Sequence, residues 1–524
     1  MSAIADALTL SREPVFLVAL ELTGKTIRVS TRDVSVPSSG DDVGFEGILL
    51  KPPAFGNSFN LDSMTYSMSS ISLSLANNGR IQDLEPDVEM DGGVGKVWIW
   101  TPGLTWEQVE ENGLLFRGTI QKQGHDRGSY SIQLVEETRF LDRTIPEQVI
   151  DTSRWPAHRT VGGGGSVAGK PIPLVFGSWE GLVPMWCVET AAFQYIIGQG
   201  IMVSTDADYT AGTVSVWNGS GAAVGAGNYA FSQPVDGQGL PTALFDFTGG
   251  QTEVLTCSVE GLMDGSGEYT GTAGDVIERP GDIIHYLWAN YTRLVQSGVI
   301  GVGSLKALRA NLPGTSFAVW IGAQSTVREV VDRILVQCLC ARAQIMGKVS
   351  VVAFEPNWSK APPPAAYLDT TVDALAGSVA IGRTPMDKVC NAVLTQYQWD
   401  PLASTHTMVT WRDWTNDDRC EKSKNRYGAR PTAQLSLPDV RSITAATTLQ
   451  SRYLDWFAMR HDLLYMTCSW EKGIDVQEGD VALITCPEGP ARDAGGWIEE
   501  PFMLLERKFT QTGIDQVWWR YGTE

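Results

Sequence analysis

Alternation of apolar and polar residues with a period of two is the feature that most constrains the fold of this chain. In the first 150 residues this alternation is more frequent than a helical period, and the segment 71–75, Ile-Ser-Leu-Ser-Leu, shows it in full. A strand with this pattern buries one face and leaves the other in water. An apolar run at 15–20, a turn at 23–25 and a second run at 26–29 predict a hairpin. We therefore expect residues 1–150 to form an N-terminal β domain.

The rest of the chain predicts three further domains. Its 524 residues exceed what one hydrophobic core usually covers. Short strands separated by Gly, Asn and Ser predict a second β unit over 151–275, after a glycine-rich connector. Helical periodicity follows in 276–360, which predicts an α+β domain, and a proline-rich linker at 361–365 leads to a C-terminal β domain over 361–524. The expected fold class is mainly β with a smaller α+β part, in several domains.

Helices are expected only after residue 275. An apolar stripe over 283–295 follows Asp282, which we expect to be its N-cap. A second stripe over 327–339 follows Thr326, and Glu329 three residues later completes a capping box. Two amphipathic helices are therefore predicted in the α+β domain.

The eight cysteines predict neither disulfides nor a zinc site. They include no CxxC pair and no cysteine–histidine group with zinc spacing, in a chain too large to need disulfides for stability. Cys338 and Cys340 are expected on the second helix, with Cys338 on its buried stripe. All eight are expected to be reduced, buried thiols.

Charge and hydropathy exclude some partners. Forty Lys and Arg against sixty Asp and Glu leave a net charge of −20, so stable binding to the phosphates of nucleic acids is not expected. No run of eighteen apolar residues occurs, so no membrane span is expected. The eighteen tryptophans supply large amphipathic side chains that suit subunit interfaces.

Two local matches to binding motifs lack residues that the chemistry needs. The segment 164–170, Gly-Gly-Ser-Val-Ala-Gly-Lys, resembles a phosphate-binding loop, but Pro171 stands where Ser or Thr would reach magnesium, and no helix can follow. A flexible connector is favoured. The segment 87–92 resembles the opening of a calcium loop, but its twelfth position is Trp98 instead of the bidentate Glu. A solvated acidic loop is favoured.

No local signature of catalysis is present. Five histidines occur without an HExxH motif, and the chain has no GxSxG elbow. The segment 219–224 has Val224 where a dinucleotide fingerprint needs Gly or Ala, so a β-turn is favoured. Carboxylate pairs that only folding brings together remain open, because glycosidase acids have no local signature. We expect no enzyme activity, no cofactor, and no catalytic or metal-binding residues.

A series of weak patterns follows one another along the chain in a characteristic order. Asn391 opens a strand that ends in Tyr397 and is followed by Asp400-Pro401, and a turn with Gly479-Asp480 enters a late strand. Earlier segments of the same series are found at 70–77, 170–177, 283–295, and 325–331 with 347–349. Together they resemble the central hub or baseplate proteins of long-tailed bacteriophages, a family that includes the tail tip proteins of lambda-like phages.

The resemblance implies a structural protein in the virion, at the tail tip or baseplate, made in the host cytoplasm. Its β-barrel or sandwich domains would form a hub ring that closes the tail tube and opens for DNA passage. The implied partners are copies of itself in a homotrimer, distal tail or tube proteins, the tape measure protein, other baseplate or fibre proteins, and DNA in transit. Two similar barrels per chain, from before residue 150 and after residue 361, would build the ring.

An alternative function of another class is a glycan-active or carbohydrate-binding tail protein, such as a cell-wall lysin. The tryptophan content and the possibility of a folded acid pair support it. For the hub, the acid excess suggests a channel wall that repels DNA, and the other explanation is that the acids cover the outer surface for solubility.

Overall fold

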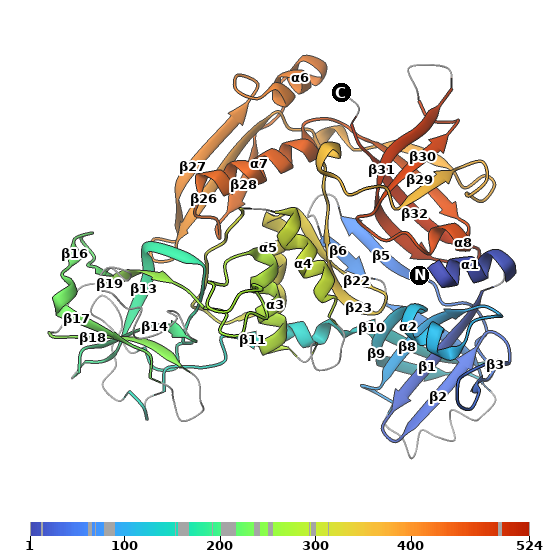
Figure 1. Ribbon diagram of the computed structural model, residues 1–524, viewed down its shortest axis with the longest axis horizontal. Helices are drawn as coiled ribbons and strands as arrows, with labels where there is room; N and C mark the ends of the chain where they lie inside the picture. Colours follow the sequence, from blue (N-terminus) through green and yellow to red (C-terminus); the bar gives the residue numbers. More distant parts are fainter. Residues whose placement is uncertain are drawn as a thin grey trace.

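The chain is mainly β, with 45% of residues in strands and 19% in helices, arranged as several curled sheets around a central α+β body (Figure 1). The computed structural model describes residues 2–522 except 12–13, 61–64, 69, 78–89, 152, 156–166, 191, 201–215, 235–240, 250–254, 293, 295–299, 313 and 491–494. The predicted fold class, mainly β with a smaller α+β part in several domains, is confirmed. Residues 87–89 of the predicted acidic loop and most of the glycine-rich connector lie outside the described residues, while Asp91 and Gly92 form an exposed turn.

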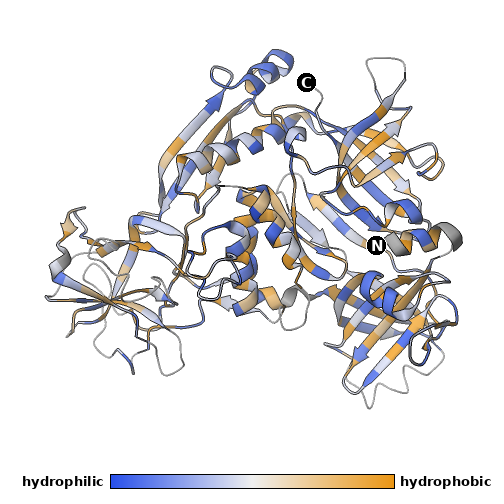
Figure 2. Ribbon diagram, viewed as in Figure 1, coloured by the Kyte–Doolittle hydropathy of each residue, from blue (hydrophilic) through white to orange (hydrophobic). Residues whose placement is uncertain are grey.

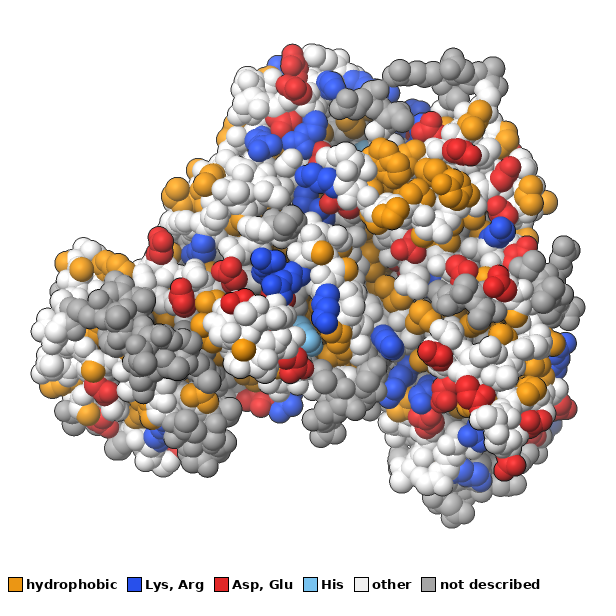
Figure 3. Space-filling model, viewed as in Figure 1, with side chains coloured by type: hydrophobic (Ala, Val, Ile, Leu, Met, Phe, Trp, Pro, Cys, Tyr) orange, Lys and Arg blue, Asp and Glu red, His pale blue; other side chains and the backbone are white. Residues whose placement is uncertain are grey.

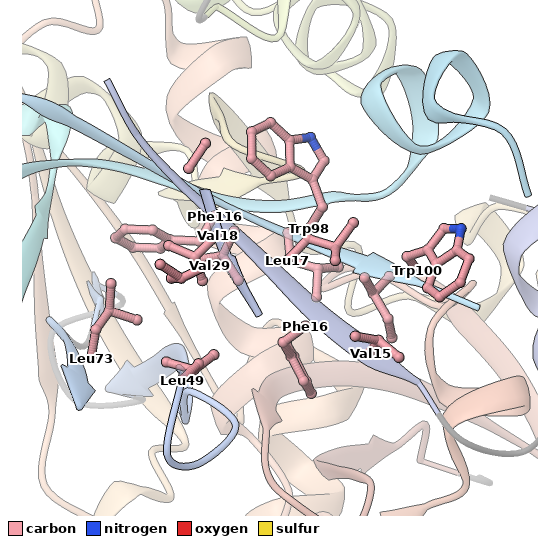
Figure 4. Packing of buried hydrophobic residues seen from close by; sticks show 14 of the residues in the cluster. Val15, Phe16, Leu17, Val18, Val29, Leu49, Leu73, Trp98, Trp100 and Phe116 are labelled. Carbon is pink, nitrogen blue, oxygen red and sulfur yellow. The ribbon is translucent and has the colours of Figure 1, made fainter. Parts of the chain in front are cut away.

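The N-terminal sheet has six antiparallel strands in the order β2-β1-β8-β9-β10-β7. The predicted hairpin is confirmed, since Leu22 of β1 pairs with Lys25 of β2 next to the turn. Strand β7 alternates buried and solvent-facing residues as predicted, and Figure 2 shows the same alternation of hydropathy on this sheet. Figure 4 shows Val18 of β1 beside Phe116 of β9, with Phe16 below the strand and Trp98 of β8 above it. The strands are β1 Val15–Leu22, β2 Lys25–Ser30, β7 Ile71–Ala76, β8 Val94–Trp100, β9 Leu114–His125 and β10 Ser129–Glu136, with a nearby hairpin of β3 Val34–Val36 and β4 Val43–Phe45.

One hairpin from the first part of the chain belongs to the C-terminal sheet. Strand β5 (Phe55–Asn60) pairs with β31, and β6 (Thr65–Met68) pairs with β5. The path of this eight-stranded sheet is β24-β30-β31-β32-β29-β25, with β5 and β6 joined at β31. Its remaining strands are β24 Ala366–Asp369, β25 Ala380–Arg383, β29 Asp462–Cys468, β30 Val481–Cys486, β31 Trp497–Phe509 and β32 Ile514–Arg520.

Phe55 lies where the N-terminal and C-terminal sheets meet. Its ring centroid is 5.8 Å from that of Phe116 on β9 and 4.9 Å from that of Phe509 on β31. Trp470 of the short helix α8 (Trp470–Gly473) contacts Phe16 of β1, with centroids 5.4 Å apart. The two sheets therefore share one hydrophobic core.

The second β unit is a seven-stranded sheet with the order β16-β15-β19-β13-β14-β18-β17, at the left of Figure 1. Its core is aromatic, and Phe245 and Phe247 of β18 are buried between its strands. The strands are β13 Ser178–Glu189, β14 Gln194–Gln199, β15 Val216–Trp217, β16 Ala223–Val224, β17 Tyr229–Ser232, β18 Thr242–Phe247 and β19 Leu255–Glu260.

The central body packs three helices against short strand pairs. The capping box that the sequence predicts at the start of α5 is confirmed, because Thr326 accepts a hydrogen bond from the amide of Glu329 and Glu329 accepts one from the amide of Thr326. The helices are α3 Pro280–Tyr291, α4 Val302–Asn311 and α5 Val327–Gln337. The paired strands are β11 Thr144–Ile145 with β21 Ser325–Thr326, β12 Leu174–Phe176 with β20 Val319–Ile321, and β22 Cys340–Ile345 with β23 Lys348–Ala353.

A three-stranded sheet with two helices stands above the central body in Figure 1. Strand β26 (Ala392–Asp400) lies between antiparallel β27 (Thr405–Asp413) and parallel β28 (Ala433–Leu437). Helices α6 (Asp418–Tyr427) and α7 (Ile443–Phe457) accompany this sheet.

Three expectations about helices are wrong. Helices α1 (Ser2–Ser11) and α2 (Trp106–Asn112) precede residue 275, where none was expected. Asp282 is not an N-cap, because α3 starts at Pro280 after Arg279. Cys340 begins strand β22 instead of continuing α5, because the chain turns through Leu339 with a positive φ of 55°.

The cysteines agree with the prediction, since all eight are free and buried. In the described part of the chain, no helix is long and apolar enough to cross a membrane.

Candidate functional site

The first four residues of the family-like motif lie on strand β26 or directly beside its ends. Asn391, which is fully buried, stands just before this strand. Its Nδ2 donates to the carbonyl of Gly428 over 2.8 Å, and its Oδ1 accepts from the amide of Arg430 over 3.0 Å. The asparagine therefore fastens the segment that follows α6 to the start of β26.

The other end of β26 forms the turn into β27. Tyr397 is 2% exposed and belongs to the core of the central body. Asp400 Oδ1 accepts hydrogen bonds from the amides of Leu402, at 2.8 Å, and Ala403, at 3.1 Å. Hydrogen bonds from Leu402 and Ala403 hold the pair Asp400-Pro401 at the tip of the hairpin, and Pro401 lines a cavity there.

Gly479 and Asp480 lie in a different sheet, at the turn before β30. Gly479 has φ +89°, and a Cβ there would lie 2.9 Å from Cγ1 of Val352, so both the conformation and the close approach favour glycine. Asp480 Oδ2 accepts from the amide of Gln477 over 2.8 Å, and burial raises the pKa of its carboxyl. The structure thus gathers Asn391, Tyr397, Asp400 and Pro401 on one strand and its turn, and holds Gly479-Asp480 elsewhere.

Folding gathers buried acids beside this turn. Glu478 accepts a hydrogen bond from Nδ2 of Asn57 over 2.9 Å, and Arg507 Nη2 is 3.6 Å from its Oε2. Glu506 accepts from the amide of Phe59 over 2.9 Å, and burial raises the pKa of Glu506. These contacts join β5 to β31 and to the turn before β30. The carboxylates of these acids therefore link strands that are distant in sequence.

The cavity beside Pro401 has a volume of about 490 Å³. It lies where the seven-stranded sheet, the central body and the three-stranded sheet meet. Three tryptophans and two arginines stand out among its lining residues, which are Trp179, Trp320, Ile321, Gly322, Ala323, Gln324, Ser325, Val330, Arg333, Trp399, Pro401, His406, Ser436, Pro438, Asp439 and Arg441.

Arg441 is the most unusual group in this cavity. Its guanidinium carbon lies 3.6 Å from the ring centroid of Trp179, and its Nη1 donates to the carbonyl of Trp399 over 2.7 Å. Within the described residues its Nε and Nη2 are buried and have no hydrogen-bond partner. Burial lowers the pKa of Arg441 to about 10, against the opposing effect of Asp439 and Asp400. The group still carries its positive charge at neutral pH.

A second arginine in the wall is fully paired. Arg333 donates through Nε to Oδ2 of Asp439 over 3.0 Å and through Nη2 to Oδ1 over 3.2 Å. Gln337 also donates to Asp439, over 2.7 Å. This bidentate pair uses both oxygens of the carboxylate and fixes the wall between α5 and the end of β28.

His406 completes the polar side of the cavity. Its Nε2 is 3.2 Å from Oγ of Ser436, and its ring centroid is 5.0 Å from that of Trp399. Burial, and then the charge of Arg441, lower the pKa of His406. The imidazole is therefore neutral at pH 7.

Among the residues that line this cavity, the sequence analysis singled out Pro401, as part of the family-like motif, and missed Trp179, Trp320 and Arg441. These residues come from distant parts of the chain, and the only signal for them in the sequence was the high tryptophan count. Among the described residues, no group of three or more His, Cys, Asp or Glu could hold a metal ion.

One further motif prediction agrees with the structure. The segment 219–224 forms a turn, in which Asn218 Oδ1 accepts from the amides of Ser220 and Ala222.

Comparison with known proteins gives likeness of structure only. No protein-family model and no curated protein matches the chain. The crystal structure of a tail protein from Neisseria meningitidis MC58 is similar with a TM-score of 0.42 and 10% identity, covering 96% of both chains. A chain in the virion of a native gene transfer agent particle gives a TM-score of 0.44 and 13% identity, over 74% of this chain and 92% of that one. A 43 kDa tail protein of prophage MuSo2 from Shewanella oneidensis gives a TM-score of 0.38 and 8% identity, over 96% and 97%.

Proposed function

We propose that this chain is a structural component of a bacteriophage tail baseplate, the hub that closes the tail tube and opens for DNA passage. The ordered motif series from segment 70–77 to Gly479-Asp480 suggests the family. The observation that carries the proposal is the continuous core between the two ends of the chain. It makes one unit from two curled sheets.

The junction of these sheets is built by long-range pairing. Strand β5 pairs with β31 through Phe55 and Phe509, and Asn57 is bonded to Glu478 in the same region. A ring subunit must transmit load between its neighbours without coming apart, and a shared core with buried polar contacts resists such separation. The two sheets are suited to serve as adjacent segments of a ring wall.

Three such chains would present six sheets around a ring, which matches a hexameric tube. In this assembly the partners are copies of the chain, tube proteins, the tape measure protein and other baseplate or fibre proteins, and the protein resides in the virion tail. DNA passes through without being held. Acidic and basic side chains are interspersed on the face in Figure 3, and neither sign covers the whole face.

Mass photometry of the purified chain and electron cryomicroscopy of tails test the proposal. We expect a species of three times the 57.0 kDa chain mass and three copies at the tail tip. Absence of the protein from purified tails would refute the tail role. Six copies or one copy in the ring would refute the trimer but leave that role intact.

A second candidate is a glycan-active or carbohydrate-binding tail protein. The cavity lined by Trp179, Trp320 and Trp399 favours it. A zymogram on bacterial peptidoglycan separates the two functions: clearing by the isolated chain would establish a lysin, and we expect none from the hub.

A further inference from the structure

We propose that the cavity beside Pro401 binds the proline-rich segment 361–365 of a second copy of this chain. The inference rests on the proposed hub function and deepens it, because it names a contact between the copies. The two surfaces lie on different parts of the chain, so the contact is head-to-tail. Contacts of this kind close into a ring when the rotation from one copy to the next allows it.

The segment 361–365, Ala-Pro-Pro-Pro-Ala, has the burial pattern of a polyproline II helix. Proline fixes its own φ at about −65° and keeps the preceding residue extended. Ala361 has φ −62° and ψ 150°, close to the values of this helix. Ala361 and Pro364 are half-buried, whereas Pro362 and Pro363 between them are exposed. With three residues per turn, the helix rests on the protein along one edge and presents its other edges to solvent.

The segment is fixed away from the cavity of its own copy. The amide of Ala365 donates to the carbonyl of Val481 over 2.7 Å. Trp358, just before the segment, packs on Tyr521 with ring centroids 5.3 Å apart. Both ends are therefore attached to the C-terminal sheet, and none of the described residues that line the cavity belongs to that sheet. The segment that enters the cavity must come from another copy.

The cavity of about 490 Å³ is lined by side chains that suit a polyproline II segment. Such segments dock into grooves of aromatic side chains, and their stiff backbone loses little conformational entropy on binding. Trp320 and Trp399 both line the cavity and are half-buried. Trp320 lies edge-on to Trp186, with ring centroids 6.3 Å apart, and Trp399 is held in the same way by His406, at 5.0 Å. The two indoles are therefore fixed before a ligand arrives.

The charges of the two surfaces are complementary. Beside the cavity, Asp400 caps turn amides through Oδ1, and Glu329 accepts from a hydroxyl of the wall over 2.7 Å. Neither acid forms an ion pair among the described residues, whereas Arg333 in the wall is paired with a carboxylate. On the segment side, Lys360 is exposed and has no ion pair within the described part of the chain. One lysine thus meets two carboxylates, which favours this orientation of the contact.

A peptide with the sequence of residues 360–366, Lys-Ala-Pro-Pro-Pro-Ala-Ala, and blocked ends tests the cavity on the full chain. Its binding is followed by the fluorescence of the chain's tryptophans, since the peptide contains none. We expect saturable binding and dissociation of the trimer, because the peptide competes with the segment of the neighbouring copy. A control peptide with three alanines in place of the prolines loses the preformed helix and should bind roughly tenfold more weakly or less. No binding of the proline peptide, or equal binding of the alanine peptide, would refute the proposal.

Two surface variants test the contact between copies by mass photometry. Pro363→Glu places a negative charge on the exposed segment, opposite the acids beside the cavity, and Ser436→Arg fills the cavity from an exposed residue of its wall. Each should weaken association by roughly tenfold or more, because like charges or overlapping atoms oppose the contact. Each should then give monomers of 57.0 kDa. The matched control Pro102→Glu, at another exposed proline, should remain a trimer, and a trimer of folded Pro363→Glu would overturn the assignment.

An equimolar mixture of the two variants tests the head-to-tail geometry. The Ser436→Arg chain keeps an intact segment and the Pro363→Glu chain keeps an intact cavity, so one contact forms between them. We expect a dimer of twice the chain mass, and monomers alone or trimers would refute a contact through these two surfaces. The peptide experiment uses the unmodified chain and covers the case in which a variant does not fold. Absence of the protein from purified tails would refute the hub function and leave the peptide and mass results unchanged.

Discussion

Replacing Phe55 by alanine should loosen the N-terminal and C-terminal sheets together. Phe55 is 2% exposed and lies between Phe116 of the first sheet and Phe509 of the last. Truncation removes the ring that both sheets contact. The backbone pairing of β5 with β31 remains, so the variant tests the core and leaves the strand order unchanged.

The expected loss of stability is large. Truncation of a buried phenylalanine to alanine costs about 3–5 kcal/mol, through lost transfer free energy and through the cavity that remains. Since each ~1.4 kcal/mol is a tenfold change in an equilibrium constant, the population of the opened state should rise by more than about 100-fold. The loss applies to both sheets because one ring contacts both.

Hydrogen–deuterium exchange measures this effect strand by strand. In Phe55→Ala, exchange should accelerate in β8 and β9 of the first sheet and in β31 and β32 of the last, to a similar extent. The matched control is Phe247→Ala in the seven-stranded sheet, where Phe247 is 5% exposed and packs on Tyr195. The control should accelerate exchange in that sheet alone.

The two variants separate a shared core from two independent ones. If Phe55→Ala accelerates exchange in only one of the two sheets, the sheets open independently, and the argument that they form one unit within a ring subunit fails. If neither sheet responds, Phe55 does not carry the junction.

Three further changes follow from local contacts. Thr326→Ala should remove the capping box of α5 and lower the free energy of unfolding by about 1 kcal/mol, measured by urea denaturation, while an unchanged midpoint would contradict the cap's role. Burial raises the pKa of Asp282 from 3.8 to about 6, although Arg309 lies 3.7 Å away, so the folded state binds this proton more tightly than the unfolded state. The protonated carboxyl therefore stabilises the fold at low pH, and this stabilisation is lost as the pH rises from about 4 through 6. Asp282→Asn should remove this pH dependence of the free energy of unfolding, and identical pH profiles for the variant and the wild type would refute it. A thiol reagent should modify none of the eight buried cysteines in the folded chain and all eight in guanidinium. Burial blocks access to the thiols, and it also raises the pKa of Cys340 to about 12, which disfavours the reactive thiolate. Rapid labelling of the folded protein would contradict the burial of the cysteines.

Strands were more predictable than helices because alternation is a local signal. The pattern at 71–75 and the hairpin of β1 and β2 follow from neighbouring residues alone. Helix α6 has only Cys420 and Ser423 buried, and the rest of its surface is polar, so no apolar stripe marks it. Its N-cap Asp417, which accepts from the amides of Arg419 and Cys420, was the available signal.

The error at Asp282 has a physical reason. A polar residue before an apolar stripe is typical of an N-cap, but Pro280 also favours the first turn of a helix and places the start three residues earlier. The displaced Asp282 is then 4% exposed and lies opposite Arg309 of α4. A contact between two helices decides its environment, and the local pattern does not contain that contact.

The cavity beside Pro401 also depends on contacts between distant segments, which local sequence patterns do not contain. Its Arg441 differs from the other interior arginines. Arg452 pairs with Glu355, and Arg507 lies beside Glu478, so burial of each cation is offset by a carboxylate of the chain itself. Arg441 instead faces Trp179 from the second β unit and has no carboxylate within ion-pair distance in the described part of the fold. The burial of Arg441 is offset instead by the face of the Trp179 indole, 3.6 Å from its guanidinium carbon, and by the carbonyl of Trp399, which accepts from its Nη1 over 2.7 Å.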